Sequence, residues 1–116
     1  IALDVVIENA TTDAGNDAIF GNPADNRIDP GAGTDYMVGG EGADVFVFGP
    51  GYGVDEVSDF ESGVDSVELQ GFGPSDYTTT FTGISTILTF NTGDMLTLYA
   101  GGPLVEANEA DFVYLA

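Results

Sequence analysis

The 116-residue chain has no cysteine, no histidine and no tryptophan, and its only basic residue is Arg27. Without cysteine there is neither a disulfide framework nor thiol chemistry. Without histidine or lysine there is no imidazole base, no amine nucleophile and no zinc site built on histidine. No apolar run approaches the roughly 18 residues of a membrane-spanning helix. These absences leave few ways to build a catalytic centre, and we predict that the chain is not itself an enzyme.

Acidic residues are abundant where basic residues are scarce. Twenty aspartates and glutamates give the chain a net charge of −19 at pH 7. Fifteen of them lie in residues 1–70 and five in residues 71–116. A charge of this size argues against nucleic acid or an anionic membrane as a partner and favours cations. Because the hydrophobic content of 43% is too high for a disordered acidic tail, we expect a folded domain.

An aspartate or asparagine recurs every nine residues, at Asp17, Asn26, Asp35 and Asp44. An apolar residue follows each of them by two positions, and a glycine or alanine precedes each by two. The best copy, GGEGADVFV at residues 39–47, fits the calcium-binding nonapeptide G-G-x-G-x-D-x-U-x. Four copies in phase therefore predict a repeat architecture.

The nine-residue period has a simple structural explanation. Six glycine-rich residues form a turn and three residues form a short strand, so two nonapeptides complete one turn of a flattened parallel solenoid. Residues eighteen apart should stack at a spacing of roughly 4.8 Å, with Asp17 beneath Asp35 and Asn26 beneath Asp44. Positive φ at the glycines would aim carbonyls inward, and these carbonyls with the carboxylates form the oxygen shell that Ca²⁺ prefers. The alternative is a turn held by local Asx hydrogen bonds without metal.

The sequence changes on both sides of the repeats. Residues 1–11 predict one strand, and the chain starts in what reads as the middle of that strand, which favours a fragment of a longer protein. Beyond the fourth copy the spacing loosens, because Asp55 follows Asp35 by twenty residues rather than eighteen. Alternating apolar and acidic residues at 54–60 and 63–69 predict half-buried strands.

Residues 71–116 are rich in threonine and apolar residues. The turn sequence at residues 91–94 predicts a hairpin. Its opposed apolar positions would be Leu88, Phe90, Leu96 and Leu98. Residues 111–115 predict a closing strand, and a single helical turn is expected near residues 106–110. We therefore predict an all-β fold, with a parallel β-roll over residues 1–70 and antiparallel capping strands after it that fold with it as one unit.

The repeats at residues 7–48 and the segment DEVSDFESGVDSVEL at residues 55–69 resemble the C-terminal domain of the serralysin-type metalloproteases and of other RTX proteins. The resemblance is close up to residue 70 and loose beyond it. It implies a parallel β-roll loaded with Ca²⁺ and capped by antiparallel strands. It also implies a bacterial protein exported by type I secretion through a signal at its extreme C-terminus. The HExxH zinc helix of that family is absent.

The resemblance also implies roles for individual residues. Asp17, Asp35 and Asp44 would bind Ca²⁺ through their side chains, and Asn26, in place of an aspartate, would make a weaker site. The turn residues that would contribute carbonyls are Gly15, Gly33, Gly42, Thr12, Pro30, Ala32, Gly39 and Glu41. The ligands where the roll meets the cap would be Asp55, Asp59 and Asp65, although solvated strand faces are the alternative for the last two. Counting stacked turns gives roughly two to four Ca²⁺ ions.

The expected function is that of a non-catalytic, calcium-binding module of a larger protein secreted by bacteria. The module would fold on binding Ca²⁺ outside the cell and would support type I secretion and stability of an upstream extracellular hydrolase, protease or polysaccharide-modifying enzyme. Its partners would be Ca²⁺, that covalently linked domain and the type I secretion machinery. Residues 111–116 are similar to a secretion signal but also read as an ordinary closing strand. A carbohydrate-binding module of a polysaccharide-active enzyme or surface adhesin is the alternative function, and an autonomous calcium buffer is a third.

Overall fold

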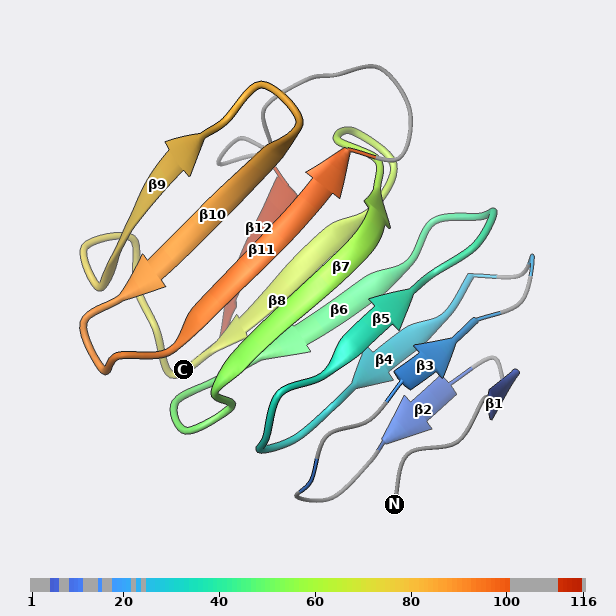
Figure 1. The fold of residues 1–116 in the computed structure, drawn as a ribbon, viewed down its shortest axis with the longest axis horizontal. Coiled ribbons are helices and arrows are strands. Elements are labelled where there is room, and N and C mark those ends of the chain that lie inside the picture. Colours follow the sequence, from blue (N-terminus) through green and yellow to red (C-terminus); the bar gives the residue numbers. More distant parts are fainter. Residues whose placement is uncertain are drawn as a thin grey trace.

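The computed structural model describes residues 5–6, 9–11, 15, 18–21, 23, 25–100 and 111–115. These residues form twelve strands in two sheets that face one another (Figure 1). The larger sheet contains, in spatial order, β1 (Val5–Val6), β3 (Ala18–Phe20), β5 (Tyr36–Val38), β7 (Val54–Phe60), β11 (Met95–Ala100), β10 (Ser85–Phe90) and β9 (Tyr77–Phe81). The smaller sheet contains β12 (Phe112–Leu115), β8 (Ser66–Gln70), β6 (Val45–Phe48), β4 (Arg27–Asp29) and β2 (Asn9–Thr11). Within these ranges, no helix is long and apolar enough to cross a membrane.

The chain alternates between the two sheets in the repeat region. Each nine-residue unit supplies one turn and one strand, so every second unit returns to the same sheet and pairs in parallel. Ile19 pairs with Met37 in one sheet, and Ile28 pairs with Phe46 in the other. The predicted stacking of residues eighteen apart is therefore confirmed.

The register after the fourth repeat shows where the period lengthens. Met37 pairs with Val57, twenty residues later, so the predicted step of twenty residues is confirmed. The second predicted strand, at residues 63–69, starts only at Ser66, because residues 61–65 form the turn that leads into it.

The prediction of one strand over residues 1–11 is wrong. The described part of this segment contains β1 and β2, which belong to different sheets. Val5 pairs with Ile19, and Ala10 pairs with Ile28, eighteen residues later. The alternation of the repeats thus extends one coil further toward the N-terminus, because position 10 keeps the repeat register even though its sequence does not match the motif.

The C-terminal segment is antiparallel only in part. β9, β10 and β11 form an antiparallel meander, as predicted, and Leu88 lies opposite Leu96. Leu98 lies opposite Thr86, so the predicted pairing of Phe90 with a leucine of the second strand is wrong: Phe90 is the last residue before the hairpin turn, and its N–H donates to the carbonyl of Asp94. β11 then pairs in parallel with β7, and β12 pairs in parallel with β8. Each sheet of the roll thus gains one more parallel strand from the cap. The helical turn expected near residues 106–110 lies outside the described residues.

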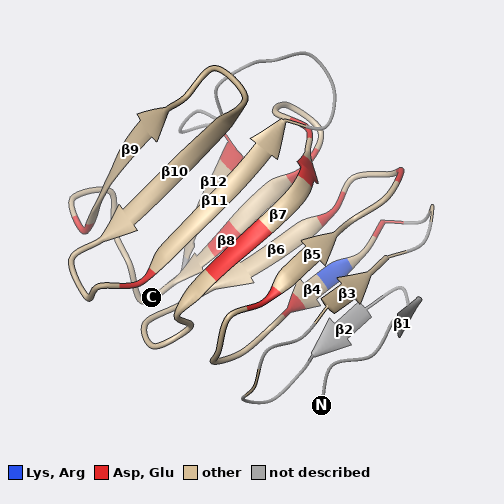
Figure 2. Ribbon diagram, in the orientation of Figure 1, with Lys and Arg blue, Asp and Glu red and all other residues tan. Residues whose placement is uncertain are grey.

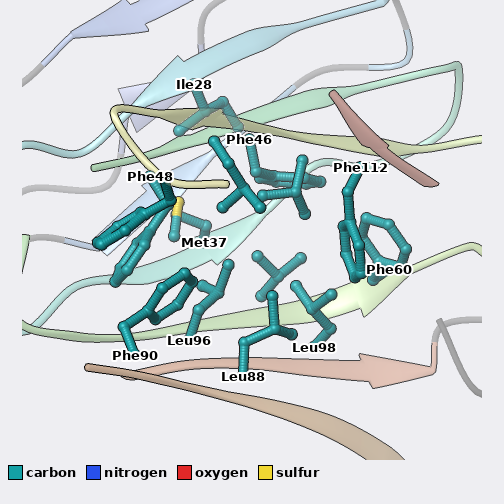
Figure 3. Packing of buried hydrophobic residues seen from close by; sticks show 14 of the residues in the cluster. Ile28, Met37, Phe46, Phe48, Phe60, Leu88, Phe90, Leu96, Leu98 and Phe112 are labelled. Atoms are coloured by element: carbon teal, nitrogen blue, oxygen red, sulfur yellow. The ribbon is translucent and has the colours of Figure 1, made fainter. Parts of the chain in front are cut away.

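Roll and cap share one hydrophobic core between the sheets (Figure 3). Its buried members are Ile19, Ile28, Met37, Phe46, Phe48, Val57, Phe60, Val67, Leu69, Phe72, Leu88, Phe90, Leu96, Leu98 and Phe112. The ring of Phe90 in the cap lies 5.0 Å from that of Phe48 in the roll and 4.3 Å from that of Phe72, measured between centroids. Aromatic pairs of this kind add about 0.5–1.5 kcal/mol beyond their buried area. Folding of the chain as a single cooperative unit stays a prediction that this shared core supports.

Candidate metal centre

The turns that join the strands of the roll gather at its two edges. Residues 39–44 and 61–65 form turns of one edge, which also holds residues 25–26 and is here named the Asp44 edge. Residues 30–35 and 49–53 form turns of the opposite edge, here named the Asp35 edge. Acidic residues lie on the strands and turns from β4 to β8, whereas β9 and β10 contain none (Figure 2). The repeat period therefore places acidic residues of successive coils next to one another.

On the Asp44 edge, each carboxylate accepts hydrogen bonds from the coil before it. The backbone N–H of Asn26 donates to Asp44 Oδ1 at 2.9 Å, and the side-chain amide of Asn26 donates to the same oxygen at 2.9 Å. The backbone N–H of Asp44 donates to Asp65 Oδ1 at 2.9 Å. All three residues are buried. The predicted stacking of Asn26 with Asp44 is confirmed, and Asp65 extends this ladder by one coil.

The Asp35 edge repeats the pattern. The backbone N–H of Asp35 donates to Asp55 Oδ1 at 2.9 Å, and both residues are buried. The backbone N–H of Glu56 donates to the carbonyl oxygen of Asp35 at 2.9 Å, which fixes the register between the two coils. Asp17, predicted to lie beneath Asp35, is outside the described residues, and so is Thr12.

Two of the buried carboxylates have one oxygen without a hydrogen-bond partner. These oxygens are Asp44 Oδ2 and Asp55 Oδ2. The basic residue of the chain does not neutralise them, because the guanidinium of Arg27 pairs with Glu68 at 2.6 Å. A buried carboxylate without a counter-charge is costly. The two oxygens therefore mark positions at which a cation would stabilise the fold.

The acid–base properties of the ladders reflect the same shortage of positive charge. Burial raises the pKa of Asp44 above its ordinary value. Burial also raises the pKa of Asp55 to about 8, and the neighbouring Asp35 carboxylate adds to the rise. Burial raises the pKa of Asp65 to about 6. Without a cation, burial at these positions disfavours the charged form of each side chain.

We predict that acid stabilises the fold when Ca²⁺ is absent. The folded-state pKa values of Asp55 and Asp65 lie above the ordinary carboxyl value, so the folded chain binds more protons than the unfolded chain between about pH 4 and pH 8. The free energy of unfolding should therefore rise as the pH falls through this window. Far-UV circular dichroism in calcium-free buffer at pH 5 and pH 8 measures the effect as a larger folded fraction at pH 5. Equal folded fractions at the two pH values would contradict it.

Glycine is required where successive turns touch. Gly33 has φ of +114°, and a β-carbon on it would collide with the carbonyl oxygen of Gly15 in the coil before. A β-carbon on Gly53 would collide in the same way with the carbonyl oxygen of Gly33. On the other edge, a β-carbon on Gly21 would collide with the carbonyl oxygen of Gly39 in the next coil, and one on Gly39 would collide with Asp44 Oδ2 in its own turn. The absence of side chains thus lets carbonyl and carboxylate oxygens share the narrow spaces between coils.

The donors at the two edges suit Ca²⁺. They are carboxylate and carbonyl oxygens, the hard ligands of which Ca²⁺ takes six to eight. In the part of the chain that the structure describes, no three acidic side chains come close enough together to hold an ion by themselves. Backbone carbonyls of the turns would therefore have to complete the shell. The side chains that would hold the ions are those of Asn26 and Asp44 on one edge and of Asp35 and Asp55 on the other.

The predicted turn ligands occupy different environments. Ala32 and Glu41 are exposed, whereas Pro30 and Gly39 are buried. Gly42 adopts a positive φ of +90°, the conformation expected for a turn glycine. Any contact of these residues with an ion through their backbone carbonyls stays a prediction.

Asp59 and Asp65 use both carboxylate oxygens in hydrogen bonds. The backbone N–H groups of Gly39 and Gly40 donate to Asp59 at 2.9 and 2.8 Å. Asp65 likewise accepts one backbone N–H on each oxygen. Neither carboxylate needs an ion to complete its hydrogen bonding, and a role as ligand stays a prediction for both.

Two acidic residues that the sequence analysis did not assign to the ladders extend them into the cap. The N–H of Gly53 donates to Asp94 at 2.9 Å, and the N–H of Gly63 donates to Asp111 at 2.9 Å. Asp94 precedes the apolar Leu96 by two positions, which is the spacing of the repeat itself. That spacing is the signal that identifies Asp94. Asp111 has Val113 at the same spacing, but Val113 is exposed and Phe112, which follows Asp111 directly, is the buried residue that pairs with Val67.

No curated protein is significantly similar to this sequence. Among solved structures, the chain is similar to the extracellular lipase LipA from Serratia marcescens, with a TM-score of 0.74 and 22% sequence identity over 97% of this chain. The match covers 19% of the lipase chain, so this chain spans about a fifth of that protein's length. The likeness confirms the parallel β-roll. A sequence model of the family described as "Peptidase M10 serralysin C terminal" matches residues 1–102. This chain therefore belongs to the family of serralysin C-terminal domains.

Proposed function

We propose that this chain is a calcium-dependent folding module of a larger secreted protein. Ca²⁺ would bind between successive turns on the Asp44 edge and the Asp35 edge. Because the unfolded chain offers no such arrangement of oxygens, the binding free energy adds to the free energy of folding. The module itself performs no catalysis, and the activity of the whole protein belongs to the covalently linked upstream domain.

The observation that carries this proposal is the pair of buried carboxylate oxygens without a donor. Asp44 Oδ2 and Asp55 Oδ2 lie on opposite edges of the roll, and in both cases the other oxygen of the carboxylate already accepts a backbone N–H. The chain has twenty acidic residues and one basic residue, and that basic residue already pairs with Glu68. Divalent cations between the coils would neutralise both edges, and the family relationship supports the same conclusion.

The expected energies are large enough to control folding. Calcium-binding modules of extracellular proteins have dissociation constants of about 10⁻⁴–10⁻³ M. One site at a 100-fold excess of free Ca²⁺ over its dissociation constant adds about 2.7 kcal/mol. Two or more such sites reach the roughly 5–15 kcal/mol that separates a folded domain from its unfolded state.

A Ca²⁺ titration followed by far-UV circular dichroism tests the proposed folding. The spectrum should be coil-like in chelator and β-rich in millimolar Ca²⁺, since repulsion between stacked carboxylates disappears only when the ions bind. Mg²⁺ at the same concentration should substitute poorly, because it demands a tighter octahedral shell. A β-rich spectrum in chelator that Ca²⁺ leaves unchanged would refute the proposal.

The same linkage suits export by type I secretion. Where Ca²⁺ is scarce, inside the producing cell, the repeats would stay unfolded and could pass through a secretion channel. At millimolar Ca²⁺ outside, they would fold. Residues 111–116 are the proposed secretion signal. A passenger fused to this chain should reach the medium through a type I exporter, and deletion of residues 111–116 should retain it in the cell. Retention of the intact fusion would argue against the export role.

A further inference from the structure

The carboxylates at the turns of the two edges differ in how completely the protein satisfies them. In Asp44 and Asp55, one oxygen accepts a backbone N–H and the other has no donor. In Asp94 and Asp111, both oxygens accept hydrogen bonds from the protein. All four residues are buried, so exposure to solvent does not explain the difference.

Asp94 closes the last turn on the Asp35 edge. Its Oδ1 accepts the N–H of Gly53 at 2.9 Å, and its Oδ2 accepts the N–H of Gly51 at 3.0 Å. The hydroxyl of Thr92 also donates to Oδ2. The two glycines belong to the turn that precedes β7, and Asp94 directly precedes β11, the strand that pairs with β7 (Figure 1).

Asp111 holds the equivalent position on the Asp44 edge. Its Oδ1 accepts the N–H of Gly63 at 2.9 Å, and its Oδ2 accepts the hydroxyl proton of Ser62 at 2.7 Å. These two donors belong to the turn that precedes β8. Asp111 directly precedes β12, the strand that pairs with β8. The two edges therefore end in the same way, and in both segments two apolar residues follow the aspartate.

We infer that Asp94 and Asp111 are metal-independent end caps of the two carboxylate ladders. Each accepts two hydrogen bonds from the turn before it, in the way that a capping side chain satisfies the exposed N–H groups at the start of a helix. Ca²⁺ then binds only between the coils that precede these caps. The assignment rests on the proposed function for the existence of the ions, and it defines where on each edge the ions stop.

The number of bound ions tests the assignment. Equilibrium dialysis with Ca²⁺ should show that Asp55→Asn loses one ion or weakens one site by about tenfold or more, because its unpartnered oxygen is replaced by an amide. Asp94→Asn and Asp111→Asn should bind as many ions as the unchanged chain, with affinities within about threefold. An Asp94→Asn variant that loses a bound ion would overturn the inference.

Hydrogen exchange of the Ca²⁺-saturated chain supplies a second readout, which reports hydrogen bonds and not the number of bound ions. Asp94→Ala removes both acceptor oxygens, so the N–H groups of Gly51 and Gly53 should exchange about tenfold faster or more. Asp111→Ala should do the same to Gly63 and leave Gly51 unaffected. Unchanged exchange at these glycines would refute the capping role. If one variant fails to fold, the other tests the same claim on the opposite edge.

The two readouts separate failure of the inference from failure of the proposed function. An unchanged chain that binds no Ca²⁺ would overturn the proposed function and, with it, the boundary that the caps set for the ions. An unchanged chain that binds Ca²⁺, together with an Asp94→Asn variant that loses an ion, would leave the proposed function intact and overturn only the caps.

Discussion

Asp35→Ala should destabilise the Ca²⁺-loaded chain far more than Asp25→Ala. Asp35 is buried on the ladder and faces Asp55 in the next coil, so its removal takes a ligand from a proposed ion site. The loss of one site that was held at a 100-fold excess of Ca²⁺ costs about 2.7 kcal/mol. Asp25 is exposed, and its carboxylate accepts one hydrogen bond, from the N–H of Ala43 at 2.8 Å. Loss of that bond should cost about 0.5–1.5 kcal/mol.

Denaturant unfolding at saturating Ca²⁺ measures both variants. A Ca²⁺ concentration just sufficient for folding provides a sharper control, because removal of Asp35 also removes a carboxylate that repels Asp55 and raises its pKa. The disadvantage of Asp35→Ala should therefore shrink as Ca²⁺ is lowered to this concentration, whereas that of Asp25→Ala should stay. Equal losses for the two variants in Ca²⁺ would show that Asp35 is not a ligand.

Gly33→Ala should prevent the coils from stacking even at saturating Ca²⁺. Gly33 combines a φ of +114° with direct contact to the carbonyl oxygen of Gly15, so a β-carbon adds a steric clash to the backbone strain. Left-handed backbone strain costs an alanine about 1–2 kcal/mol. A clash with backbone that cannot move aside should bring the total above about 4 kcal/mol, the range of the most damaging substitutions.

Gly93→Ala is the matched control for this substitution. Gly93 has a similar φ of +93°, but a β-carbon there would meet nothing within 4 Å. The difference between the two variants therefore isolates the contact between coils from the backbone strain. Circular dichroism and thermal melts in millimolar Ca²⁺ compare them. If both variants lost the same stability, the close approach of Gly33 to Gly15 would not matter to the fold.

The roll could be predicted from the sequence because its register is set by local spacing. Ile28 and Phe46 are eighteen residues apart, and a repeat of nine places them in neighbouring coils of the same sheet. The longer step to Val57 was equally visible, since the displaced Asp55 marks it in the sequence. In this region, each turn has a nearly constant length and the pattern alone determines which strands pair.

The cap could not be predicted to the same extent. The parallel pairing of β11 with β7, and of β12 with β8, joins strands that are about forty residues apart without a repeat to fix their register. Such pairing depends on the shared core, in which Phe48 packs against Phe90. The sequence therefore identified the hairpin from its turn residues but not the return of its second strand to the roll.

The candidate site, too, could be predicted only in part from the sequence. The period identifies which carboxylates stack, but it does not show how many hydrogen bonds each oxygen receives. Asp44 and Asp65 belong to one ladder, yet Asp44 has an oxygen without a donor and Asp65 does not. The difference arises because the turn after β7 supplies an additional N–H, from Glu61, that the repeat motif does not encode.

The radius of gyration with and without Ca²⁺ tests the central claim most directly. That claim is that divalent cations between the coils offset the repulsion of the carboxylate ladders. The Cα radius of gyration of the folded chain is 12.7 Å, whereas an unfolded chain of this length would measure about 35 Å. Small-angle scattering should give a compact value in millimolar Ca²⁺ and a clear expansion toward the unfolded value after dialysis against EGTA. The same compact radius and the same melting temperature in both conditions would contradict the claim.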